Sequence, residues 1–313
     1  MKVSIVTPSF NQADFLEKTI CSVLEQDYPH IEYLLVDGGS TDGSLEIIQK
    51  YSKQLTWWVS EPDSGQAEAI NKGLSRVSGD IVAWLNSDDI LLPGAIKQAV
   101  SIFTQFPETG LIYGDVLAID ARGTTTNRLT YSDMSLSDLA AFQMIGQPSV
   151  FMRRSVLEKA GYLDVSFHFL LDHHLWLRMA QLAKIRHIPE FLSAARFHAD
   201  SKNVSRAAEF GQEAFRILDW METQPILADI LQKDHNRIKA GAHRLSAFYL
   251  LDGGDPFGSL REYTRCFKLN PGSIFRDWKH LIFAVLSVLG LDRLGGVYRN
   301  LRRSLIGRDL RNG

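Results

Sequence analysis

The stretch from Gly79 to Asp89 (GDIVAWLNSDD) constrains the fold more than any other part of the chain. Its first half is an unbroken apolar run, the pattern of a strand buried on both faces of a sheet. The run stops at two adjacent carboxylates, Asp88 and Asp89. In open α/β sheets, ligands bind in the crevice outside the carboxyl ends of the strands. The stretch therefore predicts a pair of ligand-binding carboxylates, with capping of a turn or helix as the ordinary alternative for Asp.

Strand and helix patterns alternate before this stretch. Short apolar or β-branched runs are expected to form strands at 3–8, 31–36 and 55–59. Segments with apolar residues at helical spacing follow these strands and are expected to form helices at 14–26, 44–51 and 67–75. This order is the signature of a doubly wound, parallel α/β sheet. Because Asp37 follows the second strand, we expect it at the same sheet edge as Asp88 and Asp89.

The order is less regular after Asp89, and it changes near residue 203. Helices are expected at 95–106, 135–142, 155–160 and 173–183, and strands at 111–116, 148–152, 185–188 and 193–198. Beyond 203 only helical patterns are convincing, at 207–223, 225–252, 256–269 and 275–303. The prediction is an α/β domain over 1–203 followed by an all-α extension over 204–313.

Composition excludes several classes of protein. With 45% hydrophobic residues, 22% charged residues and a net charge of −2, the chain is globular and gives no sign of nucleic-acid binding. The loop Asp37-Gly38-Gly39 lacks the spacing of a dinucleotide fingerprint, and no P-loop lysine motif is present, which argues against hydride transfer and NTP hydrolysis. Cys21 and Cys266 form no disulfide framework.

Location is predicted from the two ends of the chain. No signal-peptide pattern is visible, and no apolar run reaches the roughly 18–20 residues of a spanning helix, so the expectation is the cytoplasm. An apolar run at 281–289 precedes six arginines between 293 and 311. This combination suits peripheral docking on an anionic membrane surface. The alternative is a core helix with a solvated basic end.

Several segments together carry a family resemblance. They are VTPSFN (6–11), EYLLVDGGSTDG (32–43), SEPDSGQ (60–66), AINKG (69–73) and LNSDD (85–89). With these segments, residues 3–200 resemble a family 2 glycosyltransferase of the GT-A fold, and are most similar to the bacterial branch that builds surface polysaccharides. The resemblance implies an inverting, hexosyltransferase-type enzyme that needs Mn²⁺ or Mg²⁺. It would move a sugar from a nucleotide-sugar, with UDP expected, to a saccharide or lipid-linked saccharide acceptor.

The resemblance also assigns donor-site roles. Asp37 accepts from the uracil base, and Asp88 reaches the ribose or a metal-bound water. Asp89 ligates the metal as part of a DXD-like motif. The remaining nucleotide-binding positions are Thr7, Pro8, Gly39, Gly65, Asn71 and Lys72. Each also has an ordinary alternative, since Thr7 and Pro8 end a strand and Asn71-Lys72 fits a solvated helix end.

The expected catalytic base is Asp172. The family places its base in a Glu-Asp pair that opens a helix running into Leu-Trp-Leu-Arg; here LWLR is intact at 175–178 and the pair reads Leu171-Asp172. An inverting transfer needs such a group to take the proton of the acceptor hydroxyl. A helix N-cap is the alternative for Asp172. His198, after the last expected strand, is expected to ligate the metal or contact the diphosphate, with a surface histidine as the alternative.

Two other functions stay open. A sugar-phosphate nucleotidyltransferase also uses a doubly wound sheet and paired acids, but the loop at 7–11 (TPSFN) is neither glycine-rich nor basic. A non-catalytic nucleotide-sugar binder or scaffold would explain the leucine at position 171, whereas intact Asp172, Asp88 and Asp89 argue against it.

Overall fold

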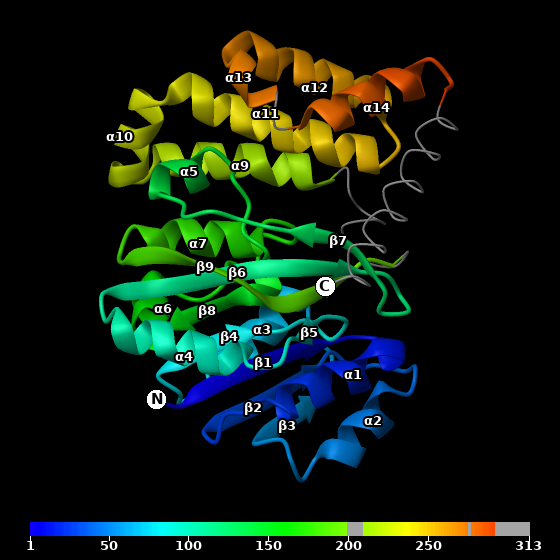
Figure 1. The fold of residues 1–313 in the computed structure, drawn as a ribbon, viewed down its shortest axis with the longest axis vertical. Helices are drawn as coiled ribbons and strands as arrows, with labels where there is room; N and C mark the ends of the chain where they lie inside the picture. The colour runs from blue at the N-terminus through cyan, green and yellow to red at the C-terminus, as the bar shows by residue number, and fades with distance from the viewer. Residues whose placement is uncertain (199–208, 275–276, 292–313) are drawn as a thin grey trace. The chain divides into compact units, whose positions relative to one another are not determined.

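The computed structural model describes residues 1–198, 209–274 and 277–291 (Figure 1). The chain divides into two compact units. The first comprises residues 1–119, 128–135 and 145–196, and the second comprises 120–127, 136–144 and 197–313. Two short segments from within the α/β part of the chain thus join the second unit. The predicted domain boundary at residue 203 stays a prediction.

One half of the sheet in the first unit is parallel. Its strand order is β3 (Trp57–Ser60), β2 (Ile31–Asp37), β1 (Val3–Ser9) and β4 (Ile81–Trp84). Every residue of β1 and β4 is buried, and burial on both faces explains the unbroken apolar sequence of β4. The connecting helices are α1 (Ala13–Leu24), α2 (Ser44–Tyr51) and α3 (Gln66–Leu74). The predicted alternation of strands and helices is confirmed here.

The other half of the sheet is mixed. β8 (Val150–Arg153) runs antiparallel to both β4 and β6 (Thr109–Ile119), and β9 (Lys184–Arg196) pairs in parallel with β6 and antiparallel with β5 (Ile90–Leu91). The parallel sheet expected from the sequence therefore extends only as far as β4. The strands predicted at 185–188 and 193–198 are one strand, β9, whose register with β6 shifts near Gly114. Hydrophobic periodicity reports neither strand direction nor such irregularities.

Helices cover both faces of β1. Ile5 packs in one cluster with Leu16 and Ile20 of α1. The next residue, Val6, points to the other face, where a Cβ atom on Gly73 of α3 would lie 2.4 Å from Val6 Cγ1. Because the helices pack on the faces of the sheet, the loops that follow the parallel strands lie at their carboxyl ends. The remaining helices of this unit are α4 (Ala95–Gln105), the 3₁₀ turn η1 (Gln147–Ser149), α6 (Arg154–Ala160) and α7 (Leu171–Ala180).

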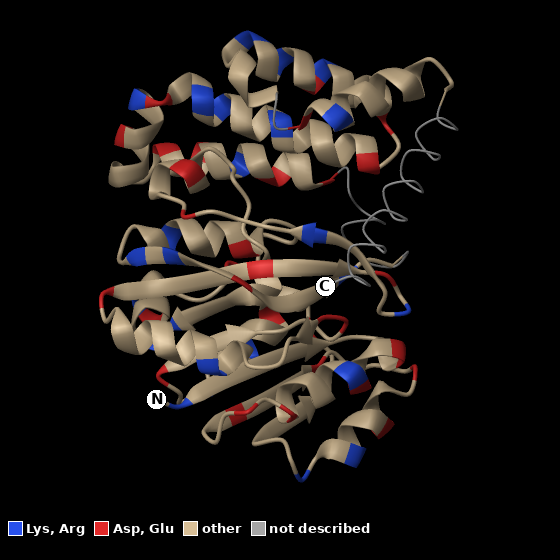
Figure 2. Cartoon of the chain, in the orientation of Figure 1, with Lys and Arg blue, Asp and Glu red and all other residues tan. Residues whose placement is uncertain are grey.

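The second unit is mainly helical. Its helices are α5 (Leu136–Ala140), α9 (Phe210–Glu222), α10 (Pro225–Lys233), α11 (His235–Asp252), α12 (Pro256–Leu269), α13 (Pro271–Ile274) and α14 (Trp278–Val288). The short strand β7 (Thr125–Leu129) crosses the division between the units. Acidic and basic residues are interspersed along these helices (Figure 2). Of the helix predicted at 275–303, residues 275–276 and 292–303 lie outside the described residues. No described helix combines the length and apolar character required to span a bilayer.

Candidate functional site

The carboxyl ends of the parallel strands meet at one edge of the sheet, as the sequence predicts. Ser9 of β1 pairs with Asp37 of β2, and Asp37 pairs with Ser60 of β3. On the other side of β1, Val6 pairs with Trp84, the last residue of β4. The loops that follow these strands therefore form a single polar edge, which is where open α/β sheets bind ligands.

Asp37 is fully buried and organises the loop after β2. Its Oδ2 accepts hydrogen bonds from the backbone N–H groups of Gly39 (3.1 Å) and Ser40 (2.9 Å) and from the Ser60 hydroxyl (2.7 Å). Its Oδ1 accepts from the Ser40 hydroxyl at 2.5 Å. Gly39 has a φ of +82°, a conformation that glycine adopts without strain. The carboxylate thus shapes the loop after β2, and the predicted contacts of Asp37 and Gly39 with a nucleotide stay predictions.

Asp63 joins this edge, although sequence reasoning assigned it no role. A Cβ atom on Gly38 would lie 2.8 Å from Asp63 Oδ2, so only glycine leaves room for this carboxylate beside Asp37. Its Oδ1 accepts from the Gly65 N–H at 2.9 Å. Burial raises the pKa of Asp63, partly offset by that hydrogen bond. Gly65 has a φ of +133° and opens α3. The position of Asp63 inside the matching segment SEPDSGQ was the available signal.

Three other predicted donor-site residues, Thr7, Asn71 and Lys72, have side-chain partners within the protein, and Pro8 is buried. Thr7 and Pro8 are buried, and the Thr7 hydroxyl lies 3.0 Å from the Tyr33 hydroxyl. The Asn71 amide donates to the Leu163 carbonyl (2.8 Å) and accepts from the Leu163 N–H (2.9 Å). Lys72 Nζ pairs with Glu61 Oε1 at 2.8 Å. Asn71 therefore ties α3 to the segment before α7, and the nucleotide roles of these residues stay predictions.

Asp88 and Asp89 form a turn directly after β4. Asp89 is 5% exposed; its Oδ1 accepts from the Arg196 N–H at 2.9 Å and its Oδ2 from the Asn86 amide at 3.3 Å. Asp88 is half-buried, and its carbonyl accepts from Arg196 Nε at 2.8 Å. Burial, and next the charge of Asp88, raises the pKa of Asp89 well above its usual range.

This donor set fits a divalent cation. A bound cation would offset both the burial of the Asp89 charge and its repulsion from Asp88. Within the part of the chain that the structure describes, no group of three or more His, Cys, Asp or Glu side chains could hold a metal ion. A cation held by one or two carboxylates plus substrate phosphates matches the usual mode of Mg²⁺ binding.

Asp172 is the second residue of α7. The N-cap of this helix is Leu170, so the N-cap alternative for Asp172 is wrong. Asp172 Oδ1 accepts from the His173 N–H at 2.7 Å. Leu171, at the position where the resemblance implies a carboxylate, is 5% exposed. A carboxylate at that position would need a partner to offset the cost of burial.

The helix that carries Asp172 packs on the strand that precedes the acidic pair. Trp176 of α7 stacks on Trp84 of β4, with ring centroids 5.2 Å apart and planes inclined by 22°. Both indoles are about 1% exposed. Asp172 lies one helical turn before Trp176, and Asp88 lies four residues after Trp84. The Trp84–Trp176 contact therefore packs α7, which carries Asp172, on β4, the strand that precedes Asp88 and Asp89.

His198 belongs to the second unit, whereas Asp88 and Asp89 belong to the first. Its predicted role as a metal ligand stays a prediction.

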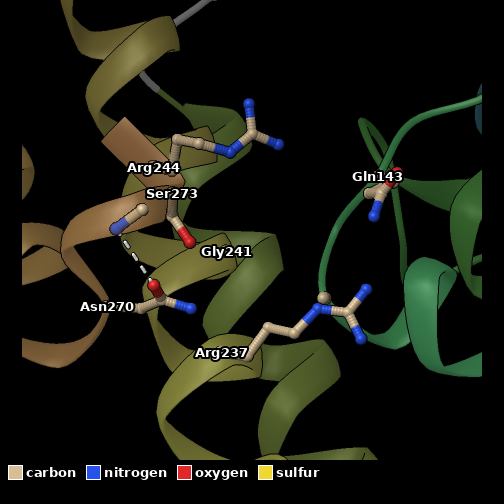
Figure 3. A pocket seen from close by; sticks show the side chains of 8 residues that line it. Gln143, Arg237, Gly241, Arg244, Asn270 and Ser273 are labelled. Atoms are coloured by element: carbon tan, nitrogen blue, oxygen red, sulfur yellow. Dashed lines mark hydrogen bonds between the residues drawn. The ribbon is translucent and has the colours of Figure 1, made fainter. Parts of the chain in front are cut away.

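The second unit contains a cavity of about 170 Å³ (Figure 3). Arg237 and Arg244 line it together with Gln143, Asn270 and Ser273. Arg237 pairs with Asp138, and Arg244 pairs with Asp277 at 3.0 Å. Because carboxylates offset both guanidinium groups, the cavity has no excess positive charge with which to bind a phosphate.

Comparison with known proteins defines the class. The sequence profile described as Glycosyl transferase family 2 matches residues 4–161, which is half of the chain. The protein belongs to the family 2 glycosyltransferases. Its fold is the mixed α/β sheet of the GT-A type followed by a helical region, and its enzyme class is glycosyltransferase.

Individual relatives and solved structures match different shares of this chain. The putative teichuronic acid biosynthesis glycosyltransferase TuaG of Bacillus subtilis is 47% identical over 140 residues, which cover 42% of this chain and 56% of TuaG. Staphylococcus aureus TarS 1–349, solved with UDP-GlcNAc, has a TM-score of 0.57 and 16% identity over 88% of this chain and 92% of that chain. The mannosyltransferase PcManGT of Pyrobaculum calidifontis, solved with GDP-Man and Mn²⁺, has a TM-score of 0.59 and 18% identity. The match covers 92% of this chain and 87% of that chain.

Proposed function

We propose that this glycosyltransferase moves a sugar from a UDP-sugar to a saccharide acceptor, with inversion and a divalent cation, in the synthesis of a bacterial surface polysaccharide. The names of the relatives support this: TuaG is described for teichuronic acid biosynthesis, and TarS was solved with UDP-GlcNAc. PcManGT was solved with Mn²⁺ and GDP-Man. A GDP-sugar is therefore the second candidate donor.

The proposed donor site lies at the carboxyl edge of the parallel strands. Asp37 is the proposed recognition residue for the base, and Asp89 the proposed metal ligand, with His198 as a further proposed ligand. The other proposed nucleotide-binding residues are Thr7, Pro8, Gly39, Gly65, Asn71, Lys72 and Asp88. A divalent cation bound at Asp89 would offset the negative charge of the departing diphosphate.

Asp172 is the proposed base. The acceptor oxygen forms a bond to the anomeric carbon, the bond from that carbon to the diphosphate oxygen breaks, and Asp172 takes the acceptor proton. The observation that carries this role is the Trp84–Trp176 stack, because it couples the start of α7 to the strand that delivers Asp88 and Asp89. Both indoles are buried, so the stack adds packing energy to the contact between α7 and β4.

An Asp172→Asn variant tests the assignment. Asparagine keeps the size of the side chain but takes no proton, so we expect UDP release in the presence of donor and acceptor to fall by about 10²- to 10⁴-fold. UDP affinity, measured by calorimetry, is expected to stay unchanged. Glu158→Gln, on an exposed face of α6, is the control for charge removal. Full turnover by Asp172→Asn would refute the base assignment.

The acceptor is proposed to be lipid-linked, with the protein in the cytoplasm and in peripheral contact with the inner face of the membrane. Helix α14 supports this contact, since Trp278, Ile282, Val285 and Leu289 recur at helical spacing and are between 43% and 64% exposed. The sequence that follows, 292–313, contains six arginines and two aspartates. Apolar and cationic groups together favour an anionic lipid surface.

Vesicle co-sedimentation tests the membrane contact. We expect binding to vesicles rich in phosphatidylglycerol and little binding to pure phosphatidylcholine vesicles, because the basic segment needs anionic headgroups. An Ile282→Ser/Leu289→Ser variant is expected to bind less, whereas Phe257→Ser, an exposed aromatic on α12, serves as the matched control. Equal sedimentation of all three proteins would exclude the α14 face as the docking surface.

A further inference from the structure

A chain of three side-chain amides runs through the turn that carries Asp89. Gln66, the first residue of α3, donates from Nε2 to Asn86 Oδ1 at 2.8 Å. Asn86 Nδ2 donates to Gln147 Oε1 at 3.2 Å and to Asp89 Oδ2 at 3.3 Å. Gln147 Nε2 donates to the Trp84 carbonyl at 2.9 Å. The chain thus joins α3, the acidic turn, η1 and the end of β4.

The Trp84 carbonyl sets the direction of these hydrogen bonds. A carbonyl oxygen only accepts, so Gln147 must turn its NH₂ group toward Trp84 and its oxygen toward Asn86. Asn86 must then present its NH₂ group, whose second hydrogen faces Asp89. The Asn86 oxygen, on the opposite side, accepts from Gln66. A backbone atom of β4 therefore fixes which way both amides face, independently of how amide nitrogen and oxygen are assigned.

Asp89 is held from both sides. Asn86 donates to its Oδ2, and the Arg196 N–H donates to its Oδ1. A carboxylate offers about four acceptor positions, two on each oxygen. With one position occupied on each oxygen by these contacts, one on each remains for a cation.

We propose that Asn86 and Gln147 are positioning residues that orient the Asp89 carboxylate for the divalent cation. This inference rests on the proposed function. Asn86 acts directly, by a hydrogen bond to the carboxylate, and Gln147 acts through Asn86. Because Gln66 directly follows Gly65, the same chain links the donor-site loop to the orientation of Asp89. Removal of groups that orient a metal ligand typically costs about 10- to 100-fold in metal affinity.

Calorimetric titration with UDP, with and without Mn²⁺, tests the proposal on wild type, Asn86→Ala and Gln147→Leu. We expect the Mn²⁺-dependent gain in UDP affinity to fall by about 10- to 100-fold in Asn86→Ala and by less, in the same direction, in Gln147→Leu. The UDP affinity without metal is expected to stay within about twofold of wild type. Gln49→Ala, an exposed amide on α2, is the control and should behave as wild type.

Two results would overturn the inference. One is an unchanged Mn²⁺-dependent gain in both variants. The other is an equal loss of UDP affinity with and without Mn²⁺, which would make the amides part of the donor pocket or of general stability. If Asn86→Ala does not fold, Gln147→Leu decides the question, because the contacts described for Gln147 include none with Asp89. If the wild type binds no UDP with or without Mn²⁺, the proposed donor is refuted instead. This result is obtained on the wild type, before any variant is compared with it.

Discussion

Replacement of Glu32 by glutamine probes how the parallel strands are fastened at the end opposite the site. Glu32 is 6% exposed. Its Oε1 accepts from Lys2 Nζ (2.6 Å) and the Ser78 hydroxyl (2.7 Å), and its Oε2 accepts from the Ser4 hydroxyl (2.5 Å) and the Ser78 N–H (2.7 Å). One carboxylate therefore connects β1, β2 and the segment that leads into β4.

The magnitude follows from the pKa of Glu32. Burial alone would raise it, but the hydrogen bonds from Lys2, Ser4 and Ser78 outweigh burial and lower the pKa from 4.5 to about 2. At about 1.4 kcal/mol per unit, this difference corresponds to about 3 kcal/mol of folding free energy. Because the folded-state pKa is lowered, the contribution is complete above the unfolded value near 4.5 and is lost as the pH falls toward 2.

Urea unfolding of wild type and Glu32→Gln at several pH values measures this contribution. We expect Glu32→Gln to lose about 3 kcal/mol of unfolding free energy at pH 7, and the difference from wild type to shrink steadily below pH 4.5. Glu17→Gln is the matched control, because Glu17 also accepts from a lysine and a hydroxyl but is exposed. We expect Glu17→Gln to lose less unfolding free energy than Glu32→Gln. A loss that is independent of pH, or equal to that of Glu17→Gln, would refute the reasoning.

Three further substitutions test packing by urea unfolding. Gly73→Ala places a Cβ atom 2.4 Å from Val6 Cγ1, so we expect a loss of about 1–3 kcal/mol; no loss would mean that α3 does not approach β1 this closely. Trp176→Ala removes the indole stacked on Trp84 and should cost about 3–5 kcal/mol, whereas a surface-like loss below about 1 kcal/mol would contradict its burial. Gly241→Ala meets the Ala141 carbonyl oxygen at 2.2 Å, and because backbone yields less than a side chain it should destabilise more than Gly73→Ala.

The sequence predicts the parallel half of the fold because each strand there is a short apolar run that ends on polar residues. The strands of Asp37 and Trp84 pair in parallel with β1, so their carboxyl ends lie at one edge of the sheet as predicted. The mixed half is different. The sequence at 148–152 does not indicate that β8 is antiparallel to β4. The direction of a strand depends on how the chain returns to the sheet and not on local periodicity.

The candidate site shows the same limit. Motif residues such as Asp89 are visible in the sequence because they interrupt an apolar run. Gln147 is not, because it lies 61 residues beyond Asn86 and meets it only through the antiparallel return of the chain. Asn71 likewise fits a solvated helix end in the sequence, although its side-chain amide forms a hydrogen bond with the backbone of Leu163, 92 residues away. Long-range hydrogen bonds of this kind leave no periodic signal.

Titration of wild type and Asp89→Ala with UDP, GDP and CMP, each with and without Mn²⁺, tests the central claim most directly. We predict that Mn²⁺ strengthens UDP binding to wild type and that Asp89→Ala loses this gain. Stronger binding of GDP would keep the transferase but overturn the UDP assignment and the uracil role of Asp37. If none of the three nucleotides bound wild type with Mn²⁺ present, the proposed donor site at the carboxyl edge of the parallel strands would be contradicted.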